Sequence, residues 1–582
     1  MREGVNLRPR ASACNLPRCP PAVQRLGTAM VDGRWAVCLY AALLIGGGAA
    51  LQGCGGGSGG AAPAPAAPPA EIQVSHLSPV ATGCTRGATS GAPFVNSEVE
   101  PWLAIDRRDG SRWLAAWQQD RWSNTGARAL VSAVSLDGGA NWQAQLHPMS
   151  RCGGAAPGSS GDFERVTDPW VDFAPDGTAH LMGLATTGPS LVDGSASAML
   201  VSRSTDGGRT WSTPVALIHD HGVHHNDKNT LTADPIDASR IYAVWSRLDR
   251  LGNGPTMFTR STDGGRSWEA ARAIVAPRAF APSAAARSTT IGNRIVVLEG
   301  GPWRGALVNV YTQTDLANGM TNRRVVAVHS FDQGLTWSAP SLVGQLRSVG
   351  TRDAATGVRV RDGNILPAIA AAPDGTVWVA WQDARFSAGT RDAIVLARSI
   401  DAGRSWSEPM AINREADAAA FTPVVHVRAD GRVGVLHYDL RRDTPAPDTL
   451  MADAWLVTSH DGMNWSETHV AGPFDMTEAP NAGGLFLGDY QGLASTGTHF
   501  VALIAIANRD ANNRTDLYSV RRDPDSPMAQ ARVPHHRART MPPALPQAAA
   551  ARFAAAQHHA TLEAMEPRVA GWGRRAGARN AR

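Results

Sequence analysis

Short apolar runs alternate with turn residues along the chain between residues 71 and 523. Several runs form pairs around a turn that contains Gly or Asp: PWLAIDRRDGSRWLAAW (101–117), PWVDFAPDGTAHLMGL (169–184), LPAIAAAPDGTVWVAW (366–381) and PVVHVRADGRVGVLHY (423–438). Short runs bounded by such residues are typical of β-strands joined by tight turns. The pattern predicts an all-β protein and excludes a coiled coil or a protein with several membrane-spanning helices.

One motif recurs six times within this region. It reads SLDGGANW (135–142), STDGGRTW (204–211), STDGGRSW (261–268), SFDQGLTW (330–337), SIDAGRSW (399–406) and SHDGMNW (459–465). The closing Trp residues follow one another at intervals of 69, 57, 69, 69 and 59 residues. A period of this length, with several short strands in each unit, predicts a β-propeller.

The repeated motif resembles the Asp box, or bacterial neuraminidase repeat, of sialidase-like propellers, whose pattern is S-x-D-x-G-x-[ST]-W. In such a hairpin the Asp carboxylate accepts backbone N–H groups, Gly supplies a positive φ and Trp packs beneath the turn. The resemblance implies that each box joins the third and fourth strands of a blade, on the face away from the active site. We therefore interpret six aspartates as structural: Asp137, Asp206, Asp263, Asp332, Asp401 and Asp461.

The number of blades follows from the strands around the boxes. A seventh strand pair at 492–507 and a third strand near 517–520 follow the last box, and the segment EIQVSHLS (71–78) precedes the first blade. We predict seven blades, the last completed by this N-terminal strand, so that no sheet edge is left exposed. Six blades, the number in sialidases, is the alternative.

The first 54 residues resemble an export signal. Arg34 precedes an apolar run that ends in Leu51-Gln52-Gly53-Cys54, which resembles the lipobox of bacterial lipoproteins, where the Cys is lipidated. We predict lipidation at Cys54, a Gly/Pro/Ala linker at 55–70, and a lipoprotein exported to the outer membrane or the cell surface. A plain secretory signal or an uncleaved anchor is the alternative, and translation starts at either Met1 or Met30.

Charge separates the ends from the middle of the chain. The 582 residues carry a net charge of +4. Residues 1–54 have six Arg against two acids (+4) and residues 524–582 have nine Arg against three acids (+6), which leaves −6 for the residues between. We expect a disordered basic Ala/Pro/Arg tail at 524–582 and a folded part at 71–523 that binds no nucleic acid.

Two of the six cysteines lie outside the signal region, at Cys84 and Cys152. An exported protein meets an oxidising environment, so this pair is expected to form a disulfide that pins the N-terminal segment to the end of the first blade. Two free buried thiols is the alternative.

Charged residues recur where the innermost strands begin and where the second strands end. Those at the inner strands are Glu98, Glu100, Asp168, Asp227, Lys228, Arg361, Asn364, Asp489 and Tyr490, and those after the second strands include Asp120, Arg121, Asp383, Arg385, Asp439, Arg441, Arg442, Arg509 and Asp510. In such propellers these positions line the substrate funnel. Mutual ion pairs at a polar rim are one interpretation; a pocket in which acids move protons and Arg forks bind a carboxylate is the other.

The resemblance to sialidases implies a Tyr nucleophile, an acid/base carboxylate and arginines that bind the substrate carboxylate. We assign Tyr490, Glu100 and Asp168 as catalytic candidates, and we assign as substrate-binding candidates Arg121, Arg385, Arg441, Arg509 and Asp489. The Arg-Ile-Pro motif near the start of sialidases is missing, since Arg86 is the single Arg between Cys84 and Pro101. The arginine triad of that family therefore has no residue-by-residue match.

The segment HDHGVHHND (219–227) is dense in His and Asp, but its spacing fits no standard metal site, so neither metal nor cofactor is expected. We predict a membrane-anchored exo-glycosidase of sialidase type that acts on terminal acidic sugars of glycans or glycoproteins. The alternative is a non-catalytic propeller of the cell envelope that binds glycan or protein through the same funnel. The oligomeric state is left open.

Overall fold

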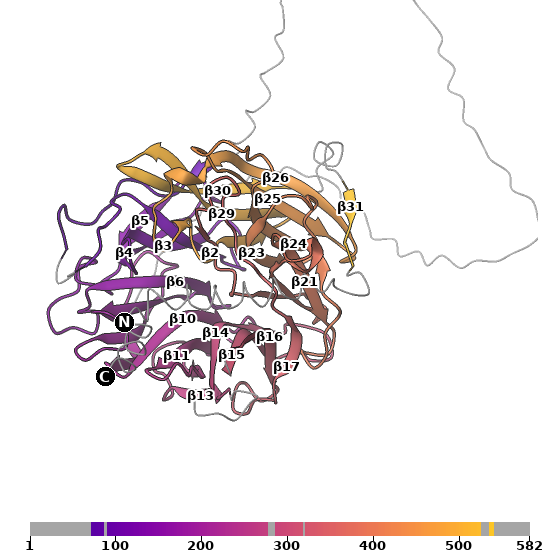
Figure 1. Ribbon diagram of the computed structural model, residues 1–582. Helices are drawn as coiled ribbons and strands as arrows, with labels where there is room; N and C mark the ends of the chain where they lie inside the picture. The colour runs from indigo at the N-terminus through magenta and orange to yellow at the C-terminus, as the bar shows by residue number, and fades with distance from the viewer. Residues whose placement is uncertain (1–70, 86–89, 278–285, 318–319, 525–534, 541–582) are drawn as a thin grey trace, which may run out of the picture. The chain divides into compact units, whose positions relative to one another are not determined.

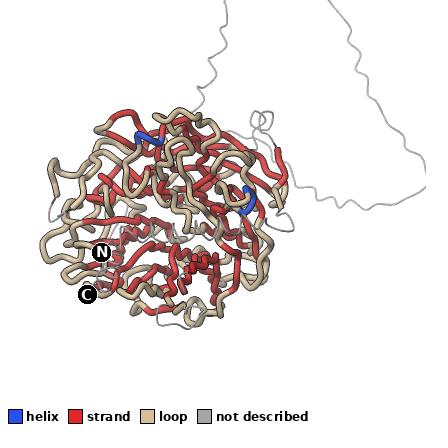
Figure 2. The backbone as a smooth tube through the Cα atoms, in the orientation of Figure 1, coloured by secondary structure: helices blue, strands red, loops and turns tan. Residues whose placement is uncertain are grey.

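The computed structural model describes residues 71–85, 90–277, 286–317, 320–524 and 535–540, all of which lie in one compact unit, Ala67–Arg582. These residues form an all-β fold, as predicted, with two short 3₁₀ helices, η1 (Arg385–Ser387) and η2 (Met476–Glu478) (Figure 2). No helix within these ranges has the length and apolar character to cross a membrane. The predicted signal, Cys54 and the linker lie outside the described residues.

The strands pair in chain order into antiparallel sheets that follow one another around a common centre (Figure 1). The first two sheets are joined by a single bridge between Ala127 and Val166. Their strands are β2 (Glu98–Ile105), β3 (Trp113–Arg121), β4 (Ala127–Ser135), β5 (Gln143–Leu146), β6 (Arg165–Phe173), β7 (Ala179–Thr187), β8 (Ala196–Ser204) and β9 (Val215–His221). The next two sheets comprise β10 (His224–Ala233), β11 (Ile241–Asp249), β12 (Thr256–Ser261), β13 (Arg272–Val275), β14 (Arg287–Val297), β15 (Leu307–Ala317), β16 (Met320–Ser330) and β17 (Ser341–Gln345).

The later sheets repeat this arrangement. They comprise β19 (Ala368–Ala371), β20 (Val377–Asp383), β21 (Ala393–Ser399) and β22 (Met410–Ala411), then β23 (Ala420–Val427), β24 (Val433–Asp439), β25 (Met451–Ser459) and β26 (Asn464–Asp475), and finally β28 (Gly492–Thr496), β29 (His499–Asp510) and β30 (Asn513–Arg522). A separate parallel pair is formed by β18 (Val360–Arg361) and β27 (Leu485–Phe486).

Burial follows strand position within a sheet. In the first sheet β3 and β4 are buried at every residue, whereas the fourth strand, β5, is exposed or half-buried throughout. The largest fully buried side chains include Trp113, Trp245 and Trp381, each on the second strand of its sheet. These sheets therefore have two apolar faces, which pack against the neighbouring sheets and leave the outer strand to face solvent.

The two ends of the series of sheets lie side by side. β1 (Ile72–Gln73) pairs with β30 through Ile72 and Ser519, as a fourth strand on the last sheet, and β2 of the first sheet packs against β28, β29 and β30 (Figure 1, indigo beside yellow). The pairing of the 71–78 segment with the strand near 517–520 agrees with the expectation from the sequence.

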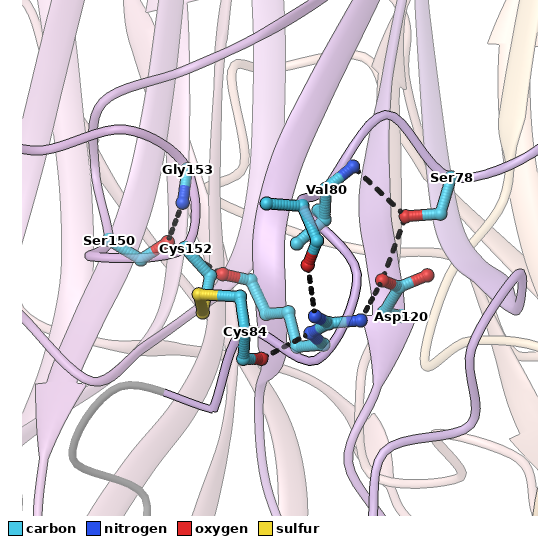
Figure 3. Close-up of a disulfide and its surroundings, with 9 residues drawn as sticks. Ser78, Val80, Cys84, Asp120, Ser150, Cys152 and Gly153 are labelled. Atoms are coloured by element: carbon cyan, nitrogen blue, oxygen red, sulfur yellow. Dashed lines mark hydrogen bonds and ion pairs between the residues drawn. A yellow bond between two sulfur atoms is a disulfide. The ribbon is translucent and has the colours of Figure 1, made fainter.

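The predicted disulfide is confirmed: Cys84 and Cys152 are bonded, with their Cα atoms 5.8 Å apart (Figure 3). Arg128 holds the same segment, because its guanidinium donates to the carbonyls of Cys84 and Ala81 and forms an ion pair of 2.9 Å with Asp120. The segment before β2 is thus fixed to the first sheet by one covalent bond and one buried arginine.

Part of the stretch expected to be disordered is a strand. β31 (His535–Arg537) pairs with β26, and the backbone of Arg539 exchanges hydrogen bonds with Ala411 of β22. Ala538 is buried between them. The composition of the tail hid this segment, because its order comes from free backbone groups on β22 and β26 and not from an apolar run of its own.

In all six Asp boxes the Asp carboxylate accepts the hydroxyl of the preceding Ser and a backbone N–H later in the turn, and in four of the boxes the Trp indole also donates to the carbonyl of the box Gly. In the fourth box Asp332 accepts the backbone N–H of Thr336 at 2.9 Å and the hydroxyl of Ser330 at 2.8 Å, and the indole of Trp337 donates to Gly334. These hydrogen bonds outweigh the effect of burial and lower the pKa of Asp332 to about 2. The last box is one residue shorter, and Asp461 accepts the N–H of Asn464 three residues on, not four.

Candidate functional site

The inner strands of the first three sheets carry the same irregularity near their starts. The ladder of β2 with β3 is interrupted around Glu100, that of β6 with β7 around Asp168, and that of β10 with β11 around Lys228. These three residues have φ values of 54°, 53° and 51°. Such left-handed conformations cost about 1–3 kcal/mol each in a residue with a Cβ, and they persist where the surrounding structure enforces them. The bulges bring three charged side chains together.

Lys228 lies at the centre of this group. Its ammonium nitrogen is 2.6 Å from Asp489 Oδ2, 3.2 Å from Asp168 Oδ1 and 3.5 Å from Glu100 Oε1. All four residues are at least nine-tenths buried. An ammonium group has three N–H donors, and here three carboxylates from three different elements surround it.

Asp489 arrives from the loop that follows β27 and is held by a second cation. Arg361 of β18 donates through Nη2 and Nε to the two oxygens of Asp489, at 2.7 and 3.2 Å. The parallel pairing of β18 with β27 places Arg361 next to Phe486, with its guanidinium carbon 4.4 Å from the ring centre, and the guanidinium carbon of Arg121 lies 4.9 Å from the same ring centre. The site is therefore assembled from segments more than a hundred residues apart.

The environments of two carboxyls drive their pKa values in opposite directions. Burial raises the pKa of Glu100 to about 8, even though Lys228 acts against the shift. Burial also opposes ionisation of Asp489, but the charges of Arg361 and Lys228 outweigh it and hold the pKa of that carboxyl well below its ordinary value. At neutral pH the site thus contains a carboxylic acid that can donate a proton and a carboxylate that stays ionised.

Aromatic rings close one side of this group. Trp102 and Trp170 stack with their ring centres 3.5 Å apart, and Tyr490 contacts both rings edge-on. The Tyr490 hydroxyl donates to the carbonyl of Pro169 at 3.0 Å. Burial, with the nearby carboxyls of Glu100 and Asp168, raises the pKa of Tyr490 well above its ordinary value.

A small pocket opens onto the charged group. Its cavity volume is about 70 Å³, the space of a few water molecules, and the polar residues that line it are Asn124, Thr125, Lys228, Arg359, Arg361, Asn364 and Asp489. Drug-sized ligands need about 300 Å³ or more, so this pocket accommodates only a small part of a larger ligand.

The structure brings five predicted site residues together: Tyr490, Glu100, Asp168, Asp489 and Arg121. The other three lie in separate settings. Arg385 is paired with Asp383 at 2.7 Å, Arg441 with Asp439 and Glu467, and Arg509 is exposed. Their substrate-binding roles stay predictions.

Lys228, Arg361, Trp102 and Arg294 belong to the same environment. The sequence placed Lys228 and Arg361 at the inner strands without assigning them a role, and it did not indicate Trp102 or Arg294. For Lys228 a signal exists: it is the one lysine of the chain, among 55 Lys and Arg residues. A lysine at one place in a chain that otherwise uses Arg indicates a position that needs a compact ammonium and that the larger, planar guanidinium does not fit. For Arg361 the sequence indicated a place at an inner strand but not its partner, because the β18–β27 pairing that positions it joins distant segments.

The His-rich segment 219–227 forms local contacts. Asp220 accepts two hydrogen bonds from Arg247, at 2.8 and 2.6 Å, and a third from Asn226. Within the ranges that the structure describes, no three His, Cys, Asp or Glu residues are grouped so as to hold a metal ion.

An all-β chain with repeated Asp boxes and charged residues at the inner strands defines a protein of the Asp-box repeat class. The sequence profile described as BNR repeat-like domain matches residues 111–435. The chain belongs to this BNR repeat family, as the motif predicted.

Several solved structures resemble the chain. Hadza microbial sialidase Hz136 is 17% identical, over 69% of this chain and 76% of that one, with a TM-score of 0.39. The alpha-L-arabinanase of Penicillium chrysogenum, complexed with arabinobiose, is 13% identical over 73% and 93%, with a TM-score of 0.40. The alpha-L-arabinofuranosidase Arb93A of Fusarium graminearum, in complex with an iminosugar inhibitor, is 11% identical over 79% and 99%, with a TM-score of 0.41. No curated protein matches the chain.

Proposed function

We propose that the protein is a glycan-acting glycoside hydrolase of exo-sialidase type, directed at terminal acidic sugars. One observation carries the proposal: Glu100 and Asp489 share Lys228 as a contact, yet the pKa of one carboxyl is raised and that of the other is lowered. Glycoside hydrolysis uses one carboxyl group that gives a proton to the leaving oxygen and a second group that stays ionised or attacks.

The roles follow from this separation. Tyr490 is the nucleophile: its hydroxyl leaves the Pro169 carbonyl and gives its proton to the Asp168 carboxylate as its oxygen bonds to the anomeric carbon. Glu100 is the proton donor to the leaving oxygen as the glycosidic bond breaks. Arg121 binds the carboxylate of the sugar, and Asp489, already ionised, orients the polar groups of the substrate. Arg385, Arg441 and Arg509 would join only through loop movement, because each now lies in its own local setting.

The test is hydrolysis of a fluorogenic sialoside by the purified protein. Wild type is expected to release the fluorophore, Tyr490→Phe to lose turnover, and Glu100→Gln to lose it above all for substrates with a poor leaving group, which need the proton most. Arg209→Met, at an exposed Asp-box residue, is the matched control. Turnover by Tyr490→Phe at the wild-type rate would overturn the nucleophile assignment.

The second candidate is a non-catalytic propeller that binds glycan or protein. The small cavity and the engaged Tyr490 hydroxyl favour it. Under this alternative no sialoside or arabinoside is cleaved, while a glycan array shows bound sugars that an Arg121→Gln variant no longer retains. Failure on both counts would argue against a glycan ligand of either kind.

We further propose seven blades closed by β1, with six blades as the alternative. The four-stranded sheets and the pairing of β1 with β30 support seven blades. Removal of residues 71–78 would leave the edge of β30 unpaired, so we expect the shortened protein to associate or precipitate where the full chain does not. An equally soluble and stable shortened protein would contradict closure by this strand.

Export and anchoring through Cys54 are proposed as well, to the outer membrane or the cell surface. The Cys84–Cys152 bond supports an oxidising location. Palmitate labelling of wild type and Cys54→Ala checks the anchor, and equal labelling of the two would refute it.

A further inference from the structure

One buried arginine beside the candidate site lacks a hydrogen-bond acceptor for its guanidinium. Arg294 lies on β14, just beyond the bulge of that strand, at the position that Trp102 and Trp170 occupy on β2 and β6. It is 7% exposed. Its guanidinium carbon lies 5.5, 5.1 and 5.9 Å from the ring centres of Trp102, Trp170 and Tyr490.

Three other buried arginines have an oxygen acceptor. Arg128 is paired with Asp120, Arg385 with Asp383, and Arg121 donates to the side-chain oxygen of Gln118. Among the described residues, no carboxylate, carbonyl or hydroxyl accepts from the Arg294 guanidinium. Burial lowers the pKa of Arg294 to about 10, and Tyr490 is the one ionisable neighbour that acts on it.

The three rings offset only part of the cost of burying the Arg294 guanidinium. Ring faces attract a cation, but they offer no lone pairs to the five N–H donors of a guanidinium. Arg stays protonated at neutral pH even with a pKa of about 10, so the charge cannot be removed by deprotonation. A buried cation is retained where an anion or another acceptor completes its surroundings.

We propose that Arg294 binds a small monovalent inorganic anion, of the size of a halide, held against the Trp102–Trp170–Tyr490 group. The size follows from the rings that surround the guanidinium and from its low exposure. The pocket beside the charged group is lined by Ile291, which belongs to the same β14 bulge as Arg294. The anion site does not depend on the proposed hydrolase activity, since it follows from the surroundings of Arg294 alone.

Bromide is the probe, because it scatters anomalously and quenches Trp fluorescence. Crystals of the full protein grown in bromide are expected to show an anomalous peak in contact with the Arg294 guanidinium. In solution, bromide titrated against gluconate at constant ionic strength is expected to quench emission in a saturable step, since Trp102 and Trp170 lie beside the site.

The variants separate binding from random collision. Arg294→Met is expected to lower bromide affinity at least tenfold or to abolish the saturable step, and Arg294→Lys, which keeps the charge but loses the fork, to weaken it less. Arg209→Met is the matched control and should titrate like wild type. Quenching that stays linear and equal in all proteins, or a bromide peak elsewhere with none at Arg294 (an adventitious ion only), would overturn the proposal.

Discussion

The contacts of Lys228 make a quantitative prediction about stability. Lys228→Met keeps much of the side-chain volume but removes the ammonium that lies 2.6, 3.2 and 3.5 Å from Asp489, Asp168 and Glu100. Removal of one partner from a buried ion pair costs about 3–5 kcal/mol, because the remaining charge is left in a medium of low polarity. Arg361 still contacts Asp489, so we expect the free energy of unfolding to fall by roughly this amount and not by a multiple of it.

The loss of stability in Lys228→Met should depend on pH, and the carboxyls around the missing ammonium determine whether it grows or shrinks as the pH falls. Without the ammonium, Asp489 loses one of the two cations that keep its pKa low, so the folded variant takes up protons more readily than the folded wild type. Stability of the variant therefore rises relative to wild type as the pH falls. The difference between the two proteins should be largest near pH 8 and should shrink toward pH 5.

Urea unfolding followed by Trp fluorescence measures this difference, with the same slope m required for both proteins. Lys228→Arg should not restore stability, because a planar guanidinium cannot place three donors around one point as an ammonium does. Arg209→Met, which removes an exposed cation, should unfold like wild type. A Lys228→Met protein within about 1 kcal/mol of wild type at pH 8 would refute the reasoning, since exposed ion pairs contribute that little.

Three further predictions concern the surroundings of the site. Replacement of Cys84 and Cys152 by Ser opens a covalent loop that spans 68 residues, and chain entropy predicts a loss of about 4 kcal/mol in stability; urea midpoints with and without reductant check it, and a wild-type midpoint that ignores reductant would contradict it. Gly363→Ala adds a Cβ 2.4 Å from the carbonyl oxygen of Asp489, at a φ of 62°, so it should shift Asp489 and lower kcat of any glycosidase activity more than overall stability; unchanged kinetics would count against a role for Asp489. Because the pKa of Glu100 is raised to about 8, folding takes up a proton there, and stability should fall as the pH rises from about 4.5 to 8; Glu100→Gln should flatten this slope, and an unchanged slope would place the proton elsewhere.

The fold was largely predictable because its signals are local. Each Asp box contains its own hydrogen-bond partners within four residues, as Asp332 and Thr336 show, and the paired strands before each box are contiguous in the sequence. Strand β31 was not predictable in the same way. Its order comes from pairing with β26, some seventy residues earlier, and its composition resembles that of a disordered tail.

The site was predictable in part, for a related reason. Glu100, Asp168 and Tyr490 were found because they stand where the innermost strands of their sheets begin. Arg385 and Arg441 were chosen because they stand where the second strands end, but each follows an Asp by two residues and pairs with it, a local contact that the spacing itself indicates. The contact of Arg361 with Asp489 and the place of Arg294 beside the rings join distant segments, for which the sequence contains no local pattern.

Because the chain has a single lysine, cleavage at Lys228 reports local unfolding around strand β10. Lys228 is buried under three carboxylates, so a lysine-specific protease can cut the chain only when the inner strand β10 detaches from its neighbours. Each cut falls after residue 228 and yields the same two fragments, because no other lysine competes. The rate at which these fragments appear in native buffer therefore measures how often the centre of the molecule opens, without any label or introduced residue.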